Sequence, residues 1–295
     1  MISYKLTEIA TKDGLIHQGA FYKPDKIGKT AILWVHGLTS SFYSDFEIFN
    51  RFCVKGRDIS LGLASFNNRG HDMIAGLRQV DPKSPSGFTH ANCGAGYEKF
   101  EDCIYDIDAG ITFLADQGYQ KIILIGHSTG AFKAGYYAGT VKDNRLSGVI
   151  VTSPISDRLI ELKTNKKLAV NLRRMKHMVD KGKGDFLVNN LTFFPLTPRR
   201  YISLFAENSV EETIFDYGSE KPLLKFFRNI KTPLFVVLAE NDEYADRSIR
   251  EIKLFFDKHQ RSVNYKSIII KNAVHGFNRQ EKTFARIVVS WLKSI

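Results

Sequence analysis

The sequence predicts an α/β protein with a mostly parallel central sheet and helices on both faces of that sheet. Strand-like and helix-like segments alternate along most of the chain, an order typical of parallel strands joined by crossover helices. Residues 31–35 are a continuous apolar run, the pattern of a strand buried on both faces, and a second short apolar run, 122–125, lies in the middle of the chain. The alternation stops at about residue 153 and resumes after 216, which predicts a segment inserted into a single sheet.

The composition fits one large domain with an insertion. The chain has 295 residues, of which 43% are hydrophobic and 25% charged, enough apolar surface for a full core. No apolar run approaches the roughly 18 residues of a membrane span, and no basic segment followed by an apolar core marks a signal peptide. We therefore expect a cytoplasmic protein that does not bind membranes. Its three cysteines form no disulfide or zinc pattern, so we expect buried free thiols.

The first quarter of the chain predicts an antiparallel pair followed by the start of the parallel sheet. Strands are expected at 3–10 and 16–22, with a turn at Lys12-Asp13-Gly14 between them. After the apolar run at 31–35, helical spacing of apolar residues covers 42–54. A further strand is expected at 61–66.

The next segments lead to a turn rich in small residues. Residues 67–96 are rich in Gly, Pro, Ser and Asn, and are too many for an idle connection, so we expect a functional loop. An amphipathic helix is predicted over 97–117. The strand at 121–125, apolar from residue 122, is followed by a short turn, by a helix of small residues at 131–139, and by a strand at 146–152.

The interruption of the pattern predicts a cap. Residues 153–216 contain a basic helical stretch at 158–176 and a Pro-containing stretch at 193–199. The alternation then resumes with a strand at 233–238, a helix at 248–259, a strand at 265–270 and a helix at 281–292. We therefore expect a core formed by 1–152 and 217–295, with 153–216 as an inserted helical cap or lid.

The turn after the strand at 121–125 has the sequence Gly126-His127-Ser128-Thr129-Gly130. Gly-x-Ser-x-Gly between a strand and a helix holds a serine on a sharp turn with its hydroxyl exposed. Side chains at the two glycines would collide with neighbouring elements. The pentapeptide alone is a weak signal, but its flanking strand and helix make Ser128 a candidate nucleophile.

A serine nucleophile needs a histidine base, which a carboxylate holds in the correct tautomer. In enzymes with this turn, the acid and the histidine follow the serine along the chain. Asp242 lies just past the strand at 233–238, with Asp246 and then Glu240 as reserve candidates. His275 follows the strand at 265–270 and precedes the last helix. We predict Ser128, Asp242 and His275 as a catalytic triad.

The oxyanion of an acyl-transfer intermediate needs hydrogen-bond donors. One is expected to be the backbone N–H of Thr129, and the other that of Leu38, which follows the strand at 31–35. Gly37 lets the backbone approach the substrate closely. We assign structural roles to His36 and His127. The remaining histidines precede the serine in the long loop or fall in predicted helices (His71, His90, His177, His259).

These motifs, which span about residues 31–280, resemble those of α/β-hydrolases of the serine-esterase type. The matching segments are His36-Gly37-Leu38-Thr39-Ser40, Asn67-Asn68-Arg69-Gly70-His71-Asp72, Gly126-His127-Ser128-Thr129-Gly130, Asn241-Asp242-Glu243 and Val274-His275-Gly276-Phe277. In its long loop and at the end of its cap, the chain is also similar to a group that contains fungal siderophore esterases. The resemblance implies the α/β-hydrolase fold and cleavage of an ester or related acyl bond through an acyl-enzyme intermediate.

The same triad also serves thioesterases, amidases or aminopeptidases and acyltransferases, and the sequence does not separate them. A non-catalytic ligand-binding protein on the same scaffold is an alternative of another class, but neither the nucleophile nor the base is missing. Hydrolysis by a triad needs no metal or organic cofactor, so none is expected. The expected partner is a small ester or acyl substrate, and the oligomeric state is left open.

The charge balance is basic, with 42 Lys and Arg against 31 Asp and Glu, a net charge of +11. The excess is dispersed and no nucleic-acid-binding motif occurs, so we expect no nucleic-acid partner. Residues 157–185 contain nine basic and four acidic side chains. A basic lid can attract an anionic substrate, but a solvated helix face is the simpler explanation of these charges.

Overall fold

The structure is a computed structural model that describes residues 2–295. Its main sheet has eight strands in the order β1-β2-β4-β3-β7-β8-β9-β10. The first two pairings, β1 with β2 and β2 with β4, are antiparallel, and all the others are parallel. These strands are β1 (Lys5–Ala10), β2 (Ile16–Tyr22), β3 (Thr30–Val35), β4 (Gly62–Phe66), β7 (Lys121–His127), β8 (Leu146–Thr152), β9 (Leu234–Ala239) and β10 (Tyr265–Ile270).

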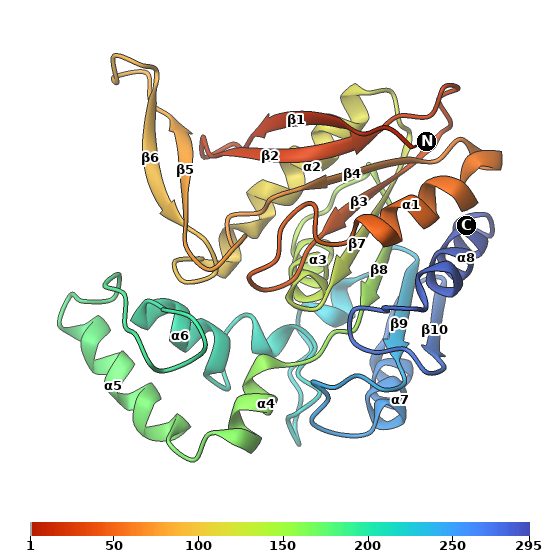
Figure 1. Cartoon of the computed structure of the whole chain (residues 1–295). Helices are drawn as coiled ribbons and strands as arrows, with labels where there is room; N and C mark the ends of the chain where they lie inside the picture. Colours follow the sequence, from red (N-terminus) through yellow and green to blue (C-terminus); the bar gives the residue numbers. More distant parts are fainter. Residues whose placement is uncertain (1) are drawn as a thin grey trace.

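Helices cover both faces of the sheet (Figure 1). They are α1 (Phe46–Lys55), α2 (Cys103–Asp116), α3 (Thr129–Thr140), α7 (Ile249–His259) and α8 (Glu281–Leu292). Successive residues of a strand point to opposite faces. In β3, accordingly, Ile32 and Trp34 belong to the apolar cluster on the face of α1 and α8, whereas Leu33 and Val35 belong to the cluster on the opposite face, against α2 and α3. This is the α/β-hydrolase fold that the sequence predicts.

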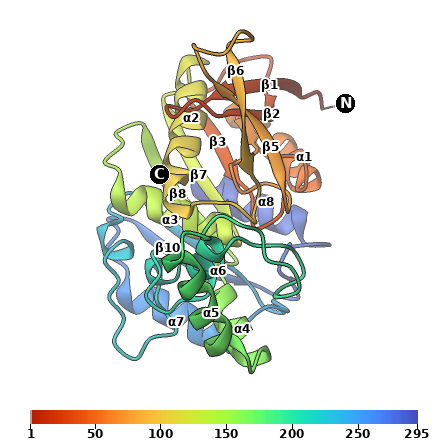
Figure 2. The ribbon, with the colours of Figure 1, turned by 90° about the vertical axis from the view of Figure 1, so that its left-hand side faces the viewer.

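Three further helices lie between β8 and β9. They are α4 (Asp157–Thr164), α5 (Leu168–Asp180) and α6 (Pro198–Phe205). Figures 1 and 2 show them grouped at the end of the sheet toward which the parallel strands run. Helices α5 and α6 share an apolar cluster, which includes Met175, Leu196 and Tyr201, whereas Leu159 of α4 belongs to the main core. Local signals fix α6, because Pro198 opens the helix and the Thr197 hydroxyl accepts the N–H of Arg200.

The long segment at 67–96 is not an irregular loop throughout. It contains an antiparallel hairpin of β5 (Ala75–Val80) and β6 (Phe88–Cys93), which forms a separate two-stranded sheet. Many side chains of the hairpin are exposed. A hairpin with this little apolar content leaves a weak periodic signal, which is why the sequence predicts a loop here.

Other expected boundaries also shift. The helix expected over 42–54 begins at Phe46, because residues 41–44 form a turn in which the Ser44 N–H donates to Ser41 O. The helix expected over 97–117 starts with a short 3-10 turn and becomes α-helical at Cys103. The basic stretch at 158–176 is divided into α4 and α5. Within residues 2–295, no helix is long and apolar enough to cross a membrane, and all three cysteines are buried and free.

Candidate active site

Ser128 lies on a sharp turn between β7 and α3. Its backbone has φ 57° and ψ −126°, a region that residues other than glycine seldom adopt. The N–H of Ser128 donates to Thr152 O at the end of β8, and its carbonyl accepts the N–H of Ala131. The turn is therefore anchored to the neighbouring strand on one side and to the helix on the other.

The two glycines of this turn are required by close packing. A Cβ on Gly126 would lie 2.1 Å from Gly130 O, and a Cβ on Gly130 would lie 2.2 Å from Val35 O. Both distances are far below van der Waals contact. The strand can therefore lead into the helix this tightly only when both positions lack a side chain.

His275 and Asp242 are hydrogen-bonded to each other. His275 Nδ1 lies 2.9 Å from each carboxylate oxygen of Asp242. A carboxylate at this distance accepts the Nδ1 proton, which leaves Nε2 as the free nitrogen of the neutral ring. Asp242 is buried and also accepts the backbone N–H of Tyr244. The acid is therefore held in place independently of the histidine.

The two reserve acids have other partners. Asp246 Oδ2 accepts from Arg247 Nε at 2.8 Å, and Glu240 Oε2 accepts the backbone N–H of Asn272 at 2.8 Å. Of the three carboxylates considered from the sequence, Asp242 is the one placed against His275.

Three residues to which the sequence patterns assign no role hold the His275 loop. Glu243 accepts the His275 N–H at 2.9 Å, and the Ser153 hydroxyl donates to the His275 carbonyl at 3.1 Å. The ring of Tyr244 meets the imidazole edge-on, with centroids 4.9 Å apart. Glu243 and Tyr244 directly follow Asp242, and Ser153 directly follows β8. Position just after the carboxyl end of a strand is the signal that could have identified them.

Ser128 and His275 line one cavity of about 390 Å³. Its wall also includes Leu38, Tyr244 and Phe193. Within residues 2–295, no hydrogen bond joins the Ser128 hydroxyl to the His275 ring. The two residues are nevertheless near each other, because the ring of His127, the residue before Ser128, has its centroid 5.0 Å from that of the His275 ring. Contacts between a nucleophile and its base are often loose without a substrate. The cavity lies beyond the ends of β3, β7 and β10, near where the connections from β3 and β7 diverge.

The candidate oxyanion donors lie on either side of Ser128. Thr129 is the first residue of α3, where a backbone N–H has no partner within the helix. Leu38 lines the cavity, and the preceding Gly37 packs so closely on the turn that a Cβ there would lie 2.9 Å from Ser128 Cβ. The backbone at 37–38 therefore approaches the serine as an oxyanion donor requires.

His36 supports this backbone and does not face a substrate. Its Nε2 lies 3.2 Å from the Asn68 N–H, and its Nδ1 lies 2.9 Å from Gly37 O. Burial lowers the pKa of His36 to about 3, so the ring is neutral, with Nε2 as acceptor and Nδ1–H as donor. The Gly37 carbonyl belongs to the same peptide plane as the Leu38 N–H. Its bond to His36 therefore fixes the direction of that N–H.

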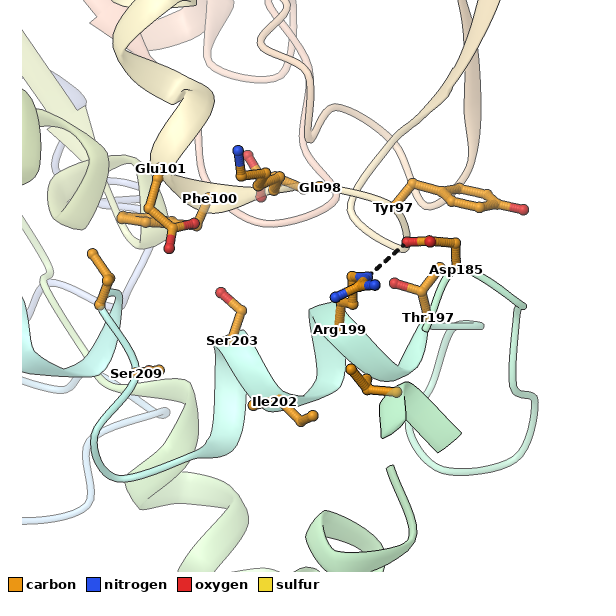
Figure 3. Close-up of a pocket in the computed structure, with 13 residues that line it drawn as sticks. Tyr97, Glu98, Phe100, Glu101, Asp185, Thr197, Arg199, Ile202, Ser203 and Ser209 are labelled. Atoms are coloured by element: carbon orange, nitrogen blue, oxygen red, sulfur yellow. Dashed lines mark hydrogen bonds and ion pairs between the residues drawn. The ribbon is translucent and has the colours of Figure 1, made fainter. Parts of the chain in front are cut away.

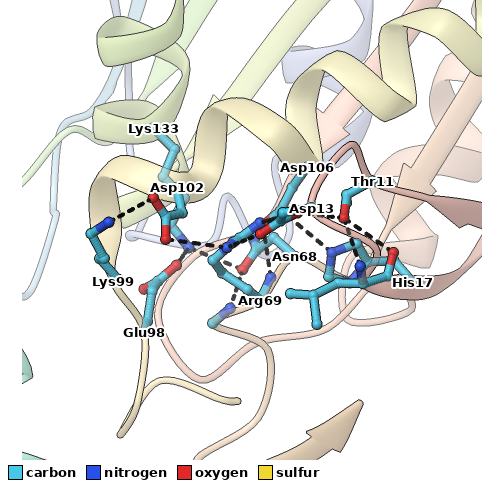
Figure 4. Close-up of polar contacts among 12 residues, drawn as sticks. Thr11, Asp13, His17, Asn68, Arg69, Glu98, Lys99, Asp102, Asp106 and Lys133 are labelled. Atoms are coloured by element: carbon cyan, nitrogen blue, oxygen red, sulfur yellow. Dashed lines mark hydrogen bonds and ion pairs between the residues drawn. The ribbon is translucent and has the colours of Figure 1, made fainter. Parts of the chain in front are cut away.

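A buried chain of charges continues from Asn68 to α6, and Figure 4 shows its first members, Asn68, Lys133 and Glu98. The Lys133 ammonium, which is 1% exposed, donates to Asn68 Oδ1 at 3.0 Å and lies 2.5 Å from Glu98 Oε1. Glu98 Oε2 lies 2.9 Å from Arg200 of α6, and Arg200 also pairs with Glu211 at 2.5 Å. The chain of contacts therefore links α6 to the helix that follows Ser128 and to the loop of His36.

A second network in Figure 4 anchors the loop that starts at Asn68. Arg69 Nη2 lies 2.8 Å from Asp106 Oδ1, and the same carboxylate contacts His17 Nε2 at 3.0 Å. Arg69 also pairs with Asp13 in the turn between β1 and β2. These ion pairs keep the pKa of Asp106 well below its usual range despite its burial, which alone would raise it.

His127 has a structural role. Burial lowers its pKa well below the ordinary value, so the ring is neutral. The Thr152 hydroxyl donates to Gly126 O and therefore accepts from His127 Nδ1 at 3.1 Å. His36 and His127 thus both make hydrogen bonds of the kind expected for structural residues.

A larger cavity, of about 640 Å³, lies elsewhere and contains none of the candidate catalytic residues. It is bounded by the segment at 97–101 and by side chains of α6, among them Ile202 and Ser203 (Figure 3). Arg199 and Asp185 pair with each other on its wall. Size alone does not make it a catalytic site. Across residues 2–295, no group of three or more His, Cys, Asp or Glu side chains is placed to hold a metal ion.

Comparison with known proteins places the chain in a family. The family described as "Protein of unknown function (DUF1749)" matches residues 86–293, more than half of the chain. The chain belongs to the DUF1749 family. This DUF1749 member is also 24% identical, over 76% of its length and 82% of the relative, to a Mycoplasma genitalium protein named as a candidate esterase or lipase.

Solved structures similar to this DUF1749 protein include esterases and lipases of the α/β-hydrolase fold. A thermostable carboxyl esterase from Bacillus coagulans matches 100% of this chain and 99% of its own, with a TM-score of 0.66 and 14% identity. A monoglyceride lipase from Saccharomyces cerevisiae matches 100% of this chain and 95% of its own, with a TM-score of 0.66 and 13% identity. At these identities the likeness establishes the fold.

Proposed function

We propose that the protein is a serine hydrolase that cleaves carboxylic esters through an acyl-enzyme intermediate. The observation that carries this proposal is the shared cavity of Ser128 and His275, together with the hydrogen bonds of His275 Nδ1 to Asp242. Similarity to a candidate esterase or lipase and to solved esterases supports an ester as the substrate.

In the proposed mechanism, His275 Nε2 takes the Ser128 proton while Oγ attacks the ester carbonyl. Asp242 stabilises the imidazolium that forms. The N–H groups of Leu38 and Thr129 bind the oxyanion, and each such donor typically lowers the barrier by about 3 kcal/mol. His275 then returns the proton to the leaving alcohol and activates the water that releases the acid.

The helical segment at 153–216 is proposed to act as a cap over this site. Ile155, Asp157, Ile160 and Phe193 from this segment line the cavity beside Ser128. A segment in that position shapes the pocket for the acyl or alcohol group.

The decisive test replaces the proposed nucleophile. Ser128→Ala should abolish hydrolysis of esters while the circular dichroism spectrum and thermal midpoint stay near those of the wild type. Ser84→Ala, in the turn between β5 and β6, is the matched control and should keep full activity. A fluorophosphonate probe should label the wild type at Ser128.

Running ester, thioester and amide substrates side by side identifies the bond that the triad cleaves best. Full ester hydrolysis by Ser128→Ala would overturn the assignment of the nucleophile. A wild type that neither turns over substrate nor reacts with the probe would instead favour a ligand-binding protein on this scaffold.

A further inference from the structure

The cavity beside Ser128 is acidic, although the protein as a whole is basic. Apart from the two histidines and Tyr244, its ionisable side chains are Asp45 and Asp157. None of the Lys or Arg side chains described lines it, including those of α4 and α5. A substrate that enters the cavity therefore meets carboxyl groups and no fixed cation.

Asp157 has no partner that neutralises it. It is the first residue of α4, and within residues 2–295 its carboxylate makes no hydrogen bond or ion pair shorter than 4.0 Å. Arg200 lies close enough to act on it, but Glu98 and Glu211 already pair with that guanidinium. Burial, helped by the negative charge of Glu211, raises the pKa of Asp157 to about 7. Such a group is stabilised in its ionised form when a cation binds beside it.

Asp45 is only partly satisfied by the protein. Its Oδ2 accepts from Trp34 Nε1 at 3.0 Å, and in the described chain its Oδ1 has no hydrogen-bond partner. Burial raises the pKa of Asp45 to about 6. The cavity thus contains two carboxyl groups with unused acceptor atoms.

We propose that this cavity selects esters that carry a cationic ammonium group, and that Asp157, assisted by Asp45, is the counter-charge that recognises it. The proposal rests on the proposed function and specifies its substrate class. The apolar wall formed by Ile155, Ile160 and Phe193 suits the carbon chain between the ester and the ammonium. An anionic substrate, which the basic helices can attract from a distance, would lie beside these carboxylates without a partner and is disfavoured.

The test compares esters that differ only in charge. For the acyl side, p-nitrophenyl esters of ε-aminohexanoate, heptanoate and pimelate carry a cationic, a neutral and an anionic end on chains of similar length. For the alcohol side, the acetate ester of choline is compared with the neutral ester in which carbon replaces the ammonium nitrogen. In at least one series, wild-type kcat/KM for the cationic ester should exceed that for the neutral ester by about tenfold or more, the effect of one charge-assisted hydrogen bond. The anionic ester should be the poorest substrate.

The variant Asp157→Asn should bring the ratio of cationic to neutral kcat/KM close to one. Glu161→Gln, on the same helix but outside the cavity wall, is the matched control and should keep the wild-type ratio. The wild-type comparison tests the preference for cationic esters even if Asp157→Asn does not fold. Esters that are cleaved without preference for the cation, or with preference for the anion, would overturn this inference and leave the proposed function intact. A wild type that cleaves no ester and does not react with the fluorophosphonate would overturn both.

Discussion

Ser128 is held in a backbone conformation that costs free energy. A residue other than glycine at φ 57° and ψ −126° typically carries about 1–3 kcal/mol of strain. The hydrogen bonds of its N–H and carbonyl to Thr152 and Ala131, and the packing of the flanking glycines, offset this strain. The same conformation exposes the hydroxyl in the cavity, which suits a nucleophile.

Replacement of the proposed acid tests the choice among three neighbouring carboxylates. Asp242→Asn should lower kcat by roughly 10⁴-fold, because an amide no longer fixes the proton on His275 Nδ1 and does not stabilise the imidazolium. Asp246→Asn should leave kcat within about twofold of the wild type, since Asp246 pairs with Arg247. Steady-state kinetics with the best ester gives both values. Equal losses in the two variants would show that the acid is misassigned.

Gly37 tests the position of the proposed oxyanion loop. An alanine Cβ would lie 2.9 Å from Ser128 Cβ and 3.3 Å from His127 O, so the loop must move away from the serine. We expect Gly37→Ala to reduce kcat by about 10²-fold or more, the effect of losing one oxyanion donor. Gly76→Ala in β5, where a Cβ meets nothing within 4 Å, is the control. Retention of wild-type kcat by Gly37→Ala would argue against Leu38 as a donor.

At the scale of elements, strands and helices were easier to predict than the side-chain networks between them. Buried strands such as β9 have apolar residues on both faces, and α7 has a capping box of Ser248 and Glu251, so local patterns mark them. Likewise, His275 and Asp242 are predicted from the sequence because each follows the end of a strand, and the structure places them in hydrogen-bond contact. By contrast, the contact between Lys133 and Glu98 joins residues 35 positions apart, and periodicity carries no information about such a pair.

One local signal did point to that network. Lys133 is the single charged residue in a helix of small and aromatic side chains, 129–140, and a lysine buried there requires a counter-charge. The counter-charge comes from Glu98, which simultaneously contacts Arg200 of α6. Helix α3, which follows Ser128, is thus joined to α6 through the buried carboxylate of Glu98.

Removal of this carboxylate should destabilise the protein strongly. Glu98→Gln keeps the shape but leaves Lys133 and Arg200 buried with one negative charge fewer, so we expect the free energy of unfolding to fall by about 3–5 kcal/mol. Urea unfolding followed by circular dichroism measures the change. Glu101→Gln, three residues further on and without an ion pair within residues 2–295, should cost far less. If the two variants were equally stable, the buried contacts of Glu98 would not contribute as described.

The net charge of the whole molecule is positive, whereas three carboxyl groups gather around one small cavity. Asp157, Glu211 and Glu212 line one small internal cavity, and Arg200 is the cation that pairs with a member of this group. Burial raises the pKa of Glu212 from 4.5 to about 8, although the Ser156 hydroxyl donates to it at 2.6 Å. At neutral pH, the folded protein therefore holds protons that the unfolded chain releases.

This difference in proton binding makes stability depend on pH. Between about pH 4.5 and pH 8 the folded state binds the Glu212 proton and the unfolded state does not, so the stability that this proton contributes is lost as pH rises through that range. Glu212→Gln mimics the protonated carboxyl and removes the loss. The thermal midpoint of the variant should therefore rise relative to the wild type between about pH 5 and pH 8.5. Glu207→Gln, an exposed position in the same segment, should show no such trend. A constant difference in thermal midpoint across this range would mean that Glu212 is ionised in the folded protein, and that its burial is compensated by a charge other than those identified around it.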